Sequence, residues 1–243
     1  MGCRLPLKCV RHRLVVLLSF LLQGCASNDT ETIRRDKGGN EEMATDLTSQ
    51  LFQAVEKSDV ESLKKVIHEK VNINAQDASN RTALMMATYN QDVEAVKLLI
   101  DAGADVNIQD DMKNTPFLYA GAEGYLDILK LTIQAGADPT IVNRYGGTAL
   151  IPASEHGYIH VIEELLTTTN IDVNHVNNLG WTALMEAIVL NNGNPTQQTA
   201  IQMLIDHGAD VNIPDKNNMS PLQHAKQKGF KEIEEILVAA GAK

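Results

Sequence analysis

The stretch Asp77–Gln109 reads DASNRTALMMATYNQDVEAVKLLIDAGADVNIQ, and a similar stretch follows it directly. Its Thr-Ala-Leu motif recurs in the same or a closely related form, with first residues Thr82, Thr115, Thr148, Thr182 and Ser220. The successive intervals are 33, 33, 34 and 38 residues, and an alanine stands five residues after the first residue of each motif. Similarity at a period of this length indicates a repeat protein, in which each unit packs only against its neighbours.

Each unit contains signals that start and end a pair of short helices. In the unit quoted above, Asp77 can bond its own backbone and begin a turn, and Thr82 can cap the first helix. Apolar residues at helical spacing follow in the second helix, and Gly103 ends it because a helix C-terminus commonly needs a left-handed residue. Since one helix pair cannot bury its own apolar side, the units have to stack.

These motifs resemble the ankyrin repeat, and the resemblance covers residues 46–243. It implies an all-α ankyrin-repeat solenoid of stacked helix pairs joined by β-turn fingers. Pro152 is expected to bend its helix slightly. The fifth repeat carries an extra polar segment, residues 191–198, which we interpret as a surface loop, with a functional loop as the alternative. The repeats are expected at about 46–76, 77–109, 110–142, 143–176, 177–214 and 215–243, the first and last as capping repeats.

Residues 1–24 do not fit the repeat pattern and have the features of a secretory signal peptide. Four basic residues precede an apolar run from Leu14 to Leu22, which is shorter than the ~20 residues that span a membrane. The run ends in Leu22-Gln23-Gly24-Cys25, which resembles the lipobox of bacterial lipoproteins. In that family the signal is removed before the cysteine, and here Cys25 would receive the lipid. The alternative is an ordinary signal that is cleaved after Ala26.

Residues 25–45 contain almost no apolar side chains, so we expect them to form a disordered tether between Cys25 and the folded domain. The protein would then be secreted across the cytoplasmic membrane and held by lipid on the periplasmic or outer side. In a Gram-negative source, Ala26 after the cysteine would favour the outer membrane; the sequence does not reveal the Gram type.

The sequence offers no candidate for catalysis and none for a metal or a cofactor. His156 and His160 have the spacing of a zinc-binding helix, but Gly157 breaks the helix between them. The net charge of −10 becomes −14 without the four basic residues of the signal segment. This charge disfavours nucleic acid as a partner, because its binding relies on Lys and Arg. Because no catalytic residues stand out, we expect a protein that is not an enzyme. We also expect it to be a monomer.

The ankyrin resemblance implies a protein-binding module whose partner lies in a concave groove. In that family the binding residues come from the turns and from the exposed side of the first helices. Four of the chain's six Tyr and Trp residues lie at such positions, and Tyr, Trp and Arg dominate interface hot spots. For Tyr145 and Trp181 the alternative is packing against neighbouring turns. The positions carried over are Arg81, Met86, Tyr89, Met112, Asn114, Tyr119, Glu123, Arg144, Tyr145, Glu155, His156, Leu179, Trp181 and Glu186.

The partner and the biological process cannot be read from the residues, and other functions stay open. One is an accessory subunit that stabilises a specific enzyme of the cell envelope. Another is a receptor for a small ligand or a carbohydrate. An enzyme would need a cluster of buried ionisable residues in the groove, and no such acid–base pair can be picked out.

Overall fold

Helix pairs stacked in a single row form the protein. The computed structural model describes the backbone of residues 35–243 and the side chains from Thr45 onward, and this part contains twelve helices and no strand. The helices are α1 (Arg35–Glu56), α2 (Val60–His68), α3 (Ala83–Tyr89), α4 (Val93–Asp101), α5 (Pro116–Glu123), α6 (Leu126–Gln134), α7 (Leu150–His156), α8 (Ile159–Thr168), α9 (Ala183–Val189), α10 (Pro195–Asp206), α11 (Pro221–Lys228) and α12 (Lys231–Ala239). The expected all-α ankyrin-repeat solenoid is confirmed.

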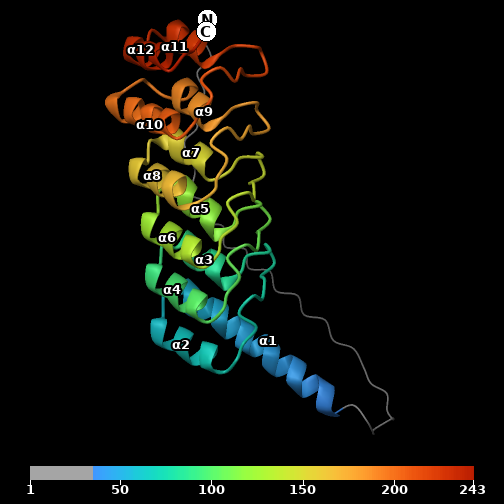
Figure 1. Ribbon diagram of the computed structural model, residues 1–243. Coiled ribbons are helices and arrows are strands. Elements are labelled where there is room, and N and C mark those ends of the chain that lie inside the picture. Colours follow the sequence, from blue (N-terminus) through green and yellow to red (C-terminus); the bar gives the residue numbers. More distant parts are fainter. Residues whose placement is uncertain (1–34) are drawn as a thin grey trace, which may run out of the picture.

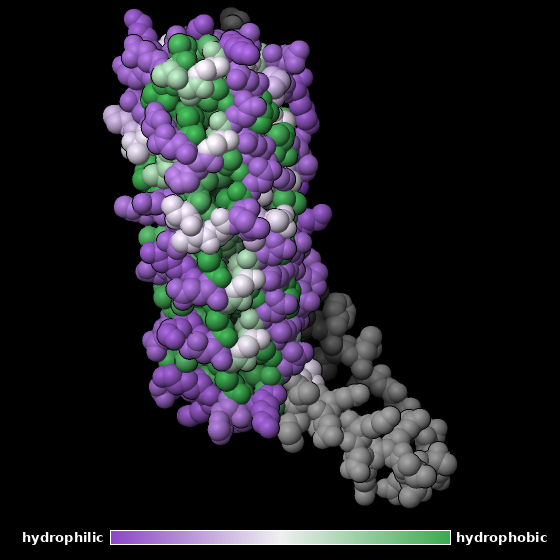
Figure 2. Space-filling view, in the orientation of Figure 1, coloured by the Kyte–Doolittle hydropathy of each residue, from purple (hydrophilic) through white to green (hydrophobic). Residues whose placement is uncertain are grey.

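The odd-numbered and even-numbered helices form two separate rows. Each odd-numbered helix contacts the next odd-numbered one, and each even-numbered helix contacts the next even-numbered one. The turns that join consecutive pairs make a third row along one side of the stack (Figure 1). In Figure 2, hydrophobic residues form a band along the length of the stack, between hydrophilic residues on both edges. Among residues 35–243, no helix combines the length and the apolar character that crossing a bilayer requires.

The predicted helix caps are present in four of the five motifs. The hydroxyls of Thr82, Thr115, Thr182 and Ser220 each accept a hydrogen bond from the backbone N–H three residues later, at 3.1, 3.1, 3.2 and 3.3 Å. These bonds satisfy donors that the first turn of a helix otherwise leaves free, and each is worth about 1 kcal/mol. The regular caps give the odd-numbered helices a common starting point.

The fourth motif departs from this arrangement at Thr148. Helix α7 begins at Leu150, later in its motif than the other odd-numbered helices, and the Thr148 hydroxyl is buried without a hydrogen-bond partner. Pro152 explains the difference, because it lacks the backbone N–H that Tyr119, at the equivalent position, donates to the carbonyl of Thr115 at 3.0 Å. The sequence predicted a slight bend at this proline. At this proline the structure shows a late helix start and a lost cap.

Replacing Pro152 with Ala should therefore raise the free energy of unfolding by about 1 kcal/mol, through a restored backbone donor and a restored cap. Urea unfolding followed by circular dichroism measures the change. Adding Thr148→Val to this variant should remove most of the gain, because the valine has no hydroxyl to cap α7. A gain that is the same with and without the Thr148 hydroxyl would contradict this explanation.

Asparagine side chains connect each unit to the next along the stack. The side-chain oxygen of Asn107 accepts a hydrogen bond from the backbone N–H of Asp138 at 2.8 Å, and Asn74 and Asn174 bond the following units in the same way at 2.9 and 2.7 Å. At the equivalent position of the third unit, the Thr140 hydroxyl instead bonds Asp138 of its own unit at 2.7 Å. These links fix the orientation of neighbouring helix pairs and so hold the turns in a defined row.

The first helix is longer than the sequence suggested. Helix α1 begins at Arg35, so the backbone of residues 35–45 is helical, whereas the sequence predicted a disordered tether there. The buried side chains of Leu51, Ala54 and Val55 anchor the C-terminal part of this helix. Extending an existing helix costs far less than starting one, so polar residues can continue it. The signal segment, Cys25 and the rest of the expected tether lie outside the described residues.

Candidate partner-binding surface

An Asp or Asn at the start of each turn holds the turn in a fixed shape. One side-chain oxygen of Asp110 accepts hydrogen bonds from the backbone N–H groups of Met112 and Asn114, both at 2.9 Å. The same pair of bonds forms at Asp77, Asn143, Asn177 and Asp215, which confirms the turn-initiating role expected of Asp77 and shows it in the other four units as well. The residue two positions later is thus presented at the tip of each turn.

Large apolar side chains occupy the tips of three consecutive turns. Met112, Tyr145 and Leu179 have exposed fractions of 40, 53 and 53%, although large apolar side chains are usually buried. We call these three residues the tip ridge. The equivalent positions in the flanking units hold the polar residues Ser79 and Asn217, so the ridge is confined to the third, fourth and fifth units.

Arg144 connects two members of the tip ridge. One guanidinium nitrogen donates to the sulfur of Met112 at 3.0 Å, and the guanidinium carbon lies 4.7 Å from the centre of the Tyr145 ring. The backbone N–H of Asn178 donates to the carbonyl of Tyr145 at 2.9 Å and links this turn to the next. Tyr145 is therefore both well exposed and held in position, as a preorganised contact residue should be.

Tyrosines join the odd-numbered helices to the turns. The Tyr89 hydroxyl donates to a carboxylate oxygen of Asp110 in the following turn at 2.5 Å, and the Tyr89 and Tyr119 rings meet edge-on with centres 4.4 Å apart. Burial, helped by the hydrogen bond to Asp110, raises the pKa of Tyr89 to about 12, so this hydroxyl stays protonated. Tyr89 therefore has a structural role that its position in the sequence did not indicate.

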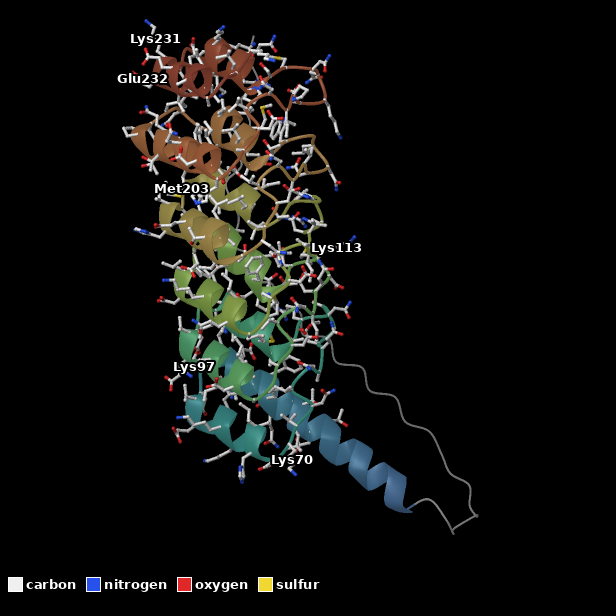
Figure 3. The ribbon with its side chains drawn as sticks, viewed as in Figure 1. Lys70, Lys97, Lys113, Met203, Lys231 and Glu232 are labelled. Carbon is white, nitrogen blue, oxygen red and sulfur yellow. The ribbon has the colours of Figure 1, made fainter. Side chains whose placement is uncertain are left out.

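Carboxylates lie on three successive odd-numbered helices that have no cation of their own. Glu123, Glu155 and Glu186 come from α5, α7 and α9, and neither Lys nor Arg occurs in α3, α5, α7 or α9. None of the three carboxylates forms an ion pair within residues 45–243. The turns, in contrast, do carry cations, such as the exposed Lys113, which lies on the side of the stack opposite Lys97 and Met203 (Figure 3).

Glu186 is the most unusual of these carboxylates because it is buried. Only 6% of the residue is exposed, and one carboxylate oxygen accepts a hydrogen bond from the Asn177 side-chain amide at 2.8 Å. Burial raises the pKa of Glu186 to about 7, and the negative charge of Glu155 adds to this effect. Near neutral pH, the carboxyl group therefore exists as a mixture of protonated and ionised forms.

The extra segment of the fifth unit supports Glu155. The side-chain amides of Asn191 and Gln197 both donate to the Glu155 carbonyl, at 2.7 and 3.0 Å. The segment does not form a loop over its whole length, because α10 begins at Pro195 with Asn194 as its cap. The predicted loop is therefore limited to its first part, and this part contacts the helix that carries Glu155.

The structure places all the predicted binding residues on the turns or on odd-numbered helices, but with different exposure. Among residues 45–243, no group of three or more His, Cys, Asp or Glu side chains is arranged to hold a metal ion. Several predicted residues already have partners in the protein; the Arg81 guanidinium, for example, donates to Asp77 at 2.8 Å. The exposed members are Met112, Glu123, Arg144, Tyr145, His156 and Leu179; the half-buried ones are Arg81, Met86, Tyr89, Asn114, Tyr119, Glu155 and Trp181; Glu186 is buried.

Sequence reasoning missed the polar pairs that connect the turns with the helices. Asn177 bonds Glu186, and in the last unit Asp215 bonds the His224 ring at 2.9 Å with the same separation of nine residues. Each pair combines groups of compatible charge: a neutral amide with Glu186, and an acid with His224. The other units have Met86, Tyr119 or Pro152 at the second position, so no repeated pattern in the sequence indicated these pairs.

Comparison with known proteins is consistent with this architecture. A family model described as "Ankyrin repeats (3 copies)" matches residues 51–143 and 118–215. The ankyrin repeat protein YahD of Escherichia coli (strain K12) is 49% identical over 82 residues, which make up 34% of this chain and 41% of YahD. An ankyrin repeat protein of Rickettsia felis is 34% identical over 79 residues, which make up 32% of this chain and 20% of that protein. The chain thus matches less than half the length of these two relatives.

Solved structures match over most of the chain. An ankyrin repeat domain from Acinetobacter baumannii AYE is 48% identical with a TM-score of 0.78, covering 79% of this chain and 98% of that domain. The ankyrin repeat protein EF0377 is 37% identical with a TM-score of 0.76, covering 79% of this chain and 97% of that one. The ankyrin repeat domain of Bcl-3, at 24% identity and a TM-score of 0.72 over 80% of this chain and 86% of that domain, shares the fold.

Proposed function

The chain belongs to the ankyrin-repeat family, whose repeats are generally non-catalytic protein-interaction modules, and we propose that it binds one partner protein while anchored in a bacterial envelope. The binding surface is the one formed by the turns and the odd-numbered helices, which we call the inner face. This role needs no chemistry from the chain. It needs a rigid surface that loses little conformational entropy when the partner binds.

The tip ridge is the observation that carries this proposal. Three large apolar side chains at equivalent positions of consecutive turns remain exposed, and Arg144 holds two of them together. Exposed apolar patches on otherwise polar proteins mark interaction sites, and Tyr, Trp and Arg are the residues that dominate binding energy there. Trp181, half-buried at the end of the turn that carries Leu179, extends this surface toward α9.

Tyr145→Ala and Trp181→Ala should each weaken partner binding by about 2 kcal/mol or more while leaving the melting transition nearly unchanged. The partner is first captured on the full chain from an envelope extract and identified by mass spectrometry, and its affinity for each variant is then measured. Glu94→Ala and Glu163→Ala, on the exposed sides of α4 and α8, are the controls and should have little effect. If the control substitutions disrupt binding and the inner-face substitutions do not, the proposed surface is wrong.

The envelope anchor rests on Cys25 and on the apolar run before it. Two or three acyl chains hold a protein on a membrane stably, whereas a single chain is marginal. Cys25→Ser should therefore abolish labelling by a fatty-acid analogue and release the protein from the membrane fraction. If the wild-type protein is recovered soluble and unlabelled, the lipid anchor is refuted, and a mature N-terminus after Ala26 would indicate an ordinary signal peptide.

A further inference from the structure

Two carboxylates on the inner face lack a cation to balance their charge. Glu155 and Glu186 lie on neighbouring helices, close enough for the charge of one to affect the other, and neither forms an ion pair within residues 45–243. Buried charges in proteins are normally paired, because removing them from water without a partner is costly. A carboxylate that is kept buried and unpaired is thus suited to receive a charge from outside.

We propose that Glu155 and Glu186 form a subsite for a lysine or arginine side chain of the partner, carried on a segment whose apolar residues lie on the tip ridge. This inference rests on the proposed function and adds the chemistry of the occupant. The occupant is a protein segment that combines a cation with apolar residues.

The geometry around the two carboxylates supports a receptor for a cation. One oxygen of Glu186 is held by the Asn177 amide, and no hydrogen bond from the protein reaches the other oxygen within residues 45–243. The backbone of Glu155 is held in place because its main-chain carbonyl accepts hydrogen bonds from the side-chain amides of Asn191 and Gln197. The second polar atom of the Gln197 side chain, its carbonyl oxygen, is buried without a partner. The acceptor that the donors of a Lys or Arg side chain can use is therefore the second oxygen of Glu186, beside the carboxylate of Glu155 on the neighbouring helix.

The tip ridge points to the same part of the molecule independently. The exposed residues Met112, Tyr145 and Leu179 belong to the third, fourth and fifth units. The three carboxylates of the inner face, Glu123, Glu155 and Glu186, belong to the same three units. Beyond these units, at both ends, the tips are polar. An occupant that needs both features is thus restricted to the middle of the stack.

The charges on the inner face also orient the occupant. The turns carry the exposed cations Lys113, Arg144 and Lys216 beside the exposed carboxylate of Asp111, whereas α5, α7 and α9 contribute three carboxylates, no Lys or Arg, and the imidazole of His156. The Lys and Arg side chains of this surface are therefore confined to the turns. A segment that places its cation against the helices and its apolar residues against the tips gains from both, whereas the reverse orientation brings like charges together.

Occupation of the subsite should be coupled to release of a proton. A nearby cation stabilises the ionised form of Glu186 and lowers its pKa, so the bound state holds fewer protons than the free state. Since the pKa of free Glu186 is about 7, affinity should rise with pH, by about tenfold between pH 6 and pH 8. The helices packed against α9 also carry two titratable histidines, His156 on α7 and His224 on α11, of which His224 is bonded to Asp215. A pH dependence that persists in His156→Gln assigns the effect to Glu186.

A display library of random peptides, selected on the full chain at pH 8, tests the proposal. The selected peptides should be rich in Lys or Arg next to aromatic or aliphatic residues. Their affinity should fall at least tenfold in Glu155→Gln/Glu186→Gln and lose its dependence on pH. Glutamine keeps the shape of the side chain and can still accept the Asn177 hydrogen bond, so the fold should be unchanged, as its circular dichroism spectrum will show. The matched control Glu94→Gln/Glu163→Gln removes the same charge from the even-numbered helices and should bind as the wild type does.

The outcomes separate the subsite from the proposed function. Peptides that depend on Tyr145 and Trp181 but bind the Glu155→Gln/Glu186→Gln variant unchanged would overturn the subsite and leave inner-face binding intact. Selected peptides whose affinity is unchanged by substitution of Tyr145, Trp181, Glu155 and Glu186 would overturn both the subsite and the proposed inner-face surface. A selection that yields no enrichment of Lys or Arg among inner-face binders would also overturn the subsite.

Discussion

Truncation of Leu99 to Ala should lower the free energy of unfolding by about 2–5 kcal/mol, because the side chain is fully buried and its loss leaves a cavity. Leu99 lies on α4 in the continuous core between stacked helix pairs. Each pair in such a row is stabilised by its neighbours, so a cavity in α4 weakens its packing against α2, α3 and α6 together.

Leu98 provides a matched control for this prediction. It is the preceding residue on the same helix, but it is only partly buried and packs at the edge of the core. Leu98→Ala should therefore cost clearly less than Leu99→Ala in the same urea unfolding experiment. Equal losses of unfolding free energy for the two variants would show that α4 turns a different side toward the core than the structure indicates.

Replacing Glu186 with Gln should stabilise the protein at pH 8 by on the order of 2–3 kcal/mol. The pKa of Glu186 rises from an ordinary value of 4.5 to about 7 in the folded protein. Each unit corresponds to about 1.4 kcal/mol that disfavours the ionised form in the folded state. Glutamine fills the same space and keeps the hydrogen bond to Asn177, but it carries no charge that has to be buried.

The direction of the pH dependence follows from the raised pKa. The folded state holds the proton of Glu186 more tightly than the unfolded state, so this residue lowers stability as pH rises from about 4.5 to about 7. Above that range its cost is constant, and below it the cost disappears. The stability difference between wild type and Glu186→Gln should therefore be near zero at pH 4.5 and large at pH 8. A difference that does not change with pH would contradict the burial of an uncompensated carboxyl group.

The elements that depend on short stretches of sequence could be predicted. The caps at Thr82 and Thr115, the turn at Asp110 and the end of α4 just before the left-handed Gly103 each involve residues within a few positions of one another. Their physical causes repeat in every unit, so the period of the sequence indicates the period of the fold. The all-α stack of helix pairs follows from this repetition.

The features that depend on the stacked arrangement were harder to predict. The helical spacing of apolar residues does not show how deeply each one is buried: the structure buries Leu99 and leaves Leu98 partly exposed, because α4 turns only one side toward its neighbours. The pairing of Asn177 with Glu186 joins residues across a turn, and the support of Glu155 by Gln197 joins two units. Such contacts require the folded geometry, since nothing in the local sequence specifies them.

At the candidate site too, the positions of the residues could be predicted from the sequence, whereas their contacts and exposure depend on the stacked arrangement. The resemblance to ankyrin repeats indicated positions on the turns and first helices, and the structure places those residues there. The sequence could not show how exposed each of these residues is. Tyr145 is exposed, Tyr89 is half-buried and bonds Asp110, and Glu186 is buried. The difference arises because each side chain meets a different neighbour in the next unit.

Amide hydrogen exchange of the full chain, with and without its captured partner, tests the inner-face assignment most directly. Binding should slow exchange in the turns around Met112, Tyr145 and Leu179 and in α7 and α9, while α4, α6 and α8 exchange as in the free protein. Slower exchange confined to α4, α6 and α8, with the three turns unchanged, would show that the partner binds the opposite side and would contradict the proposed surface.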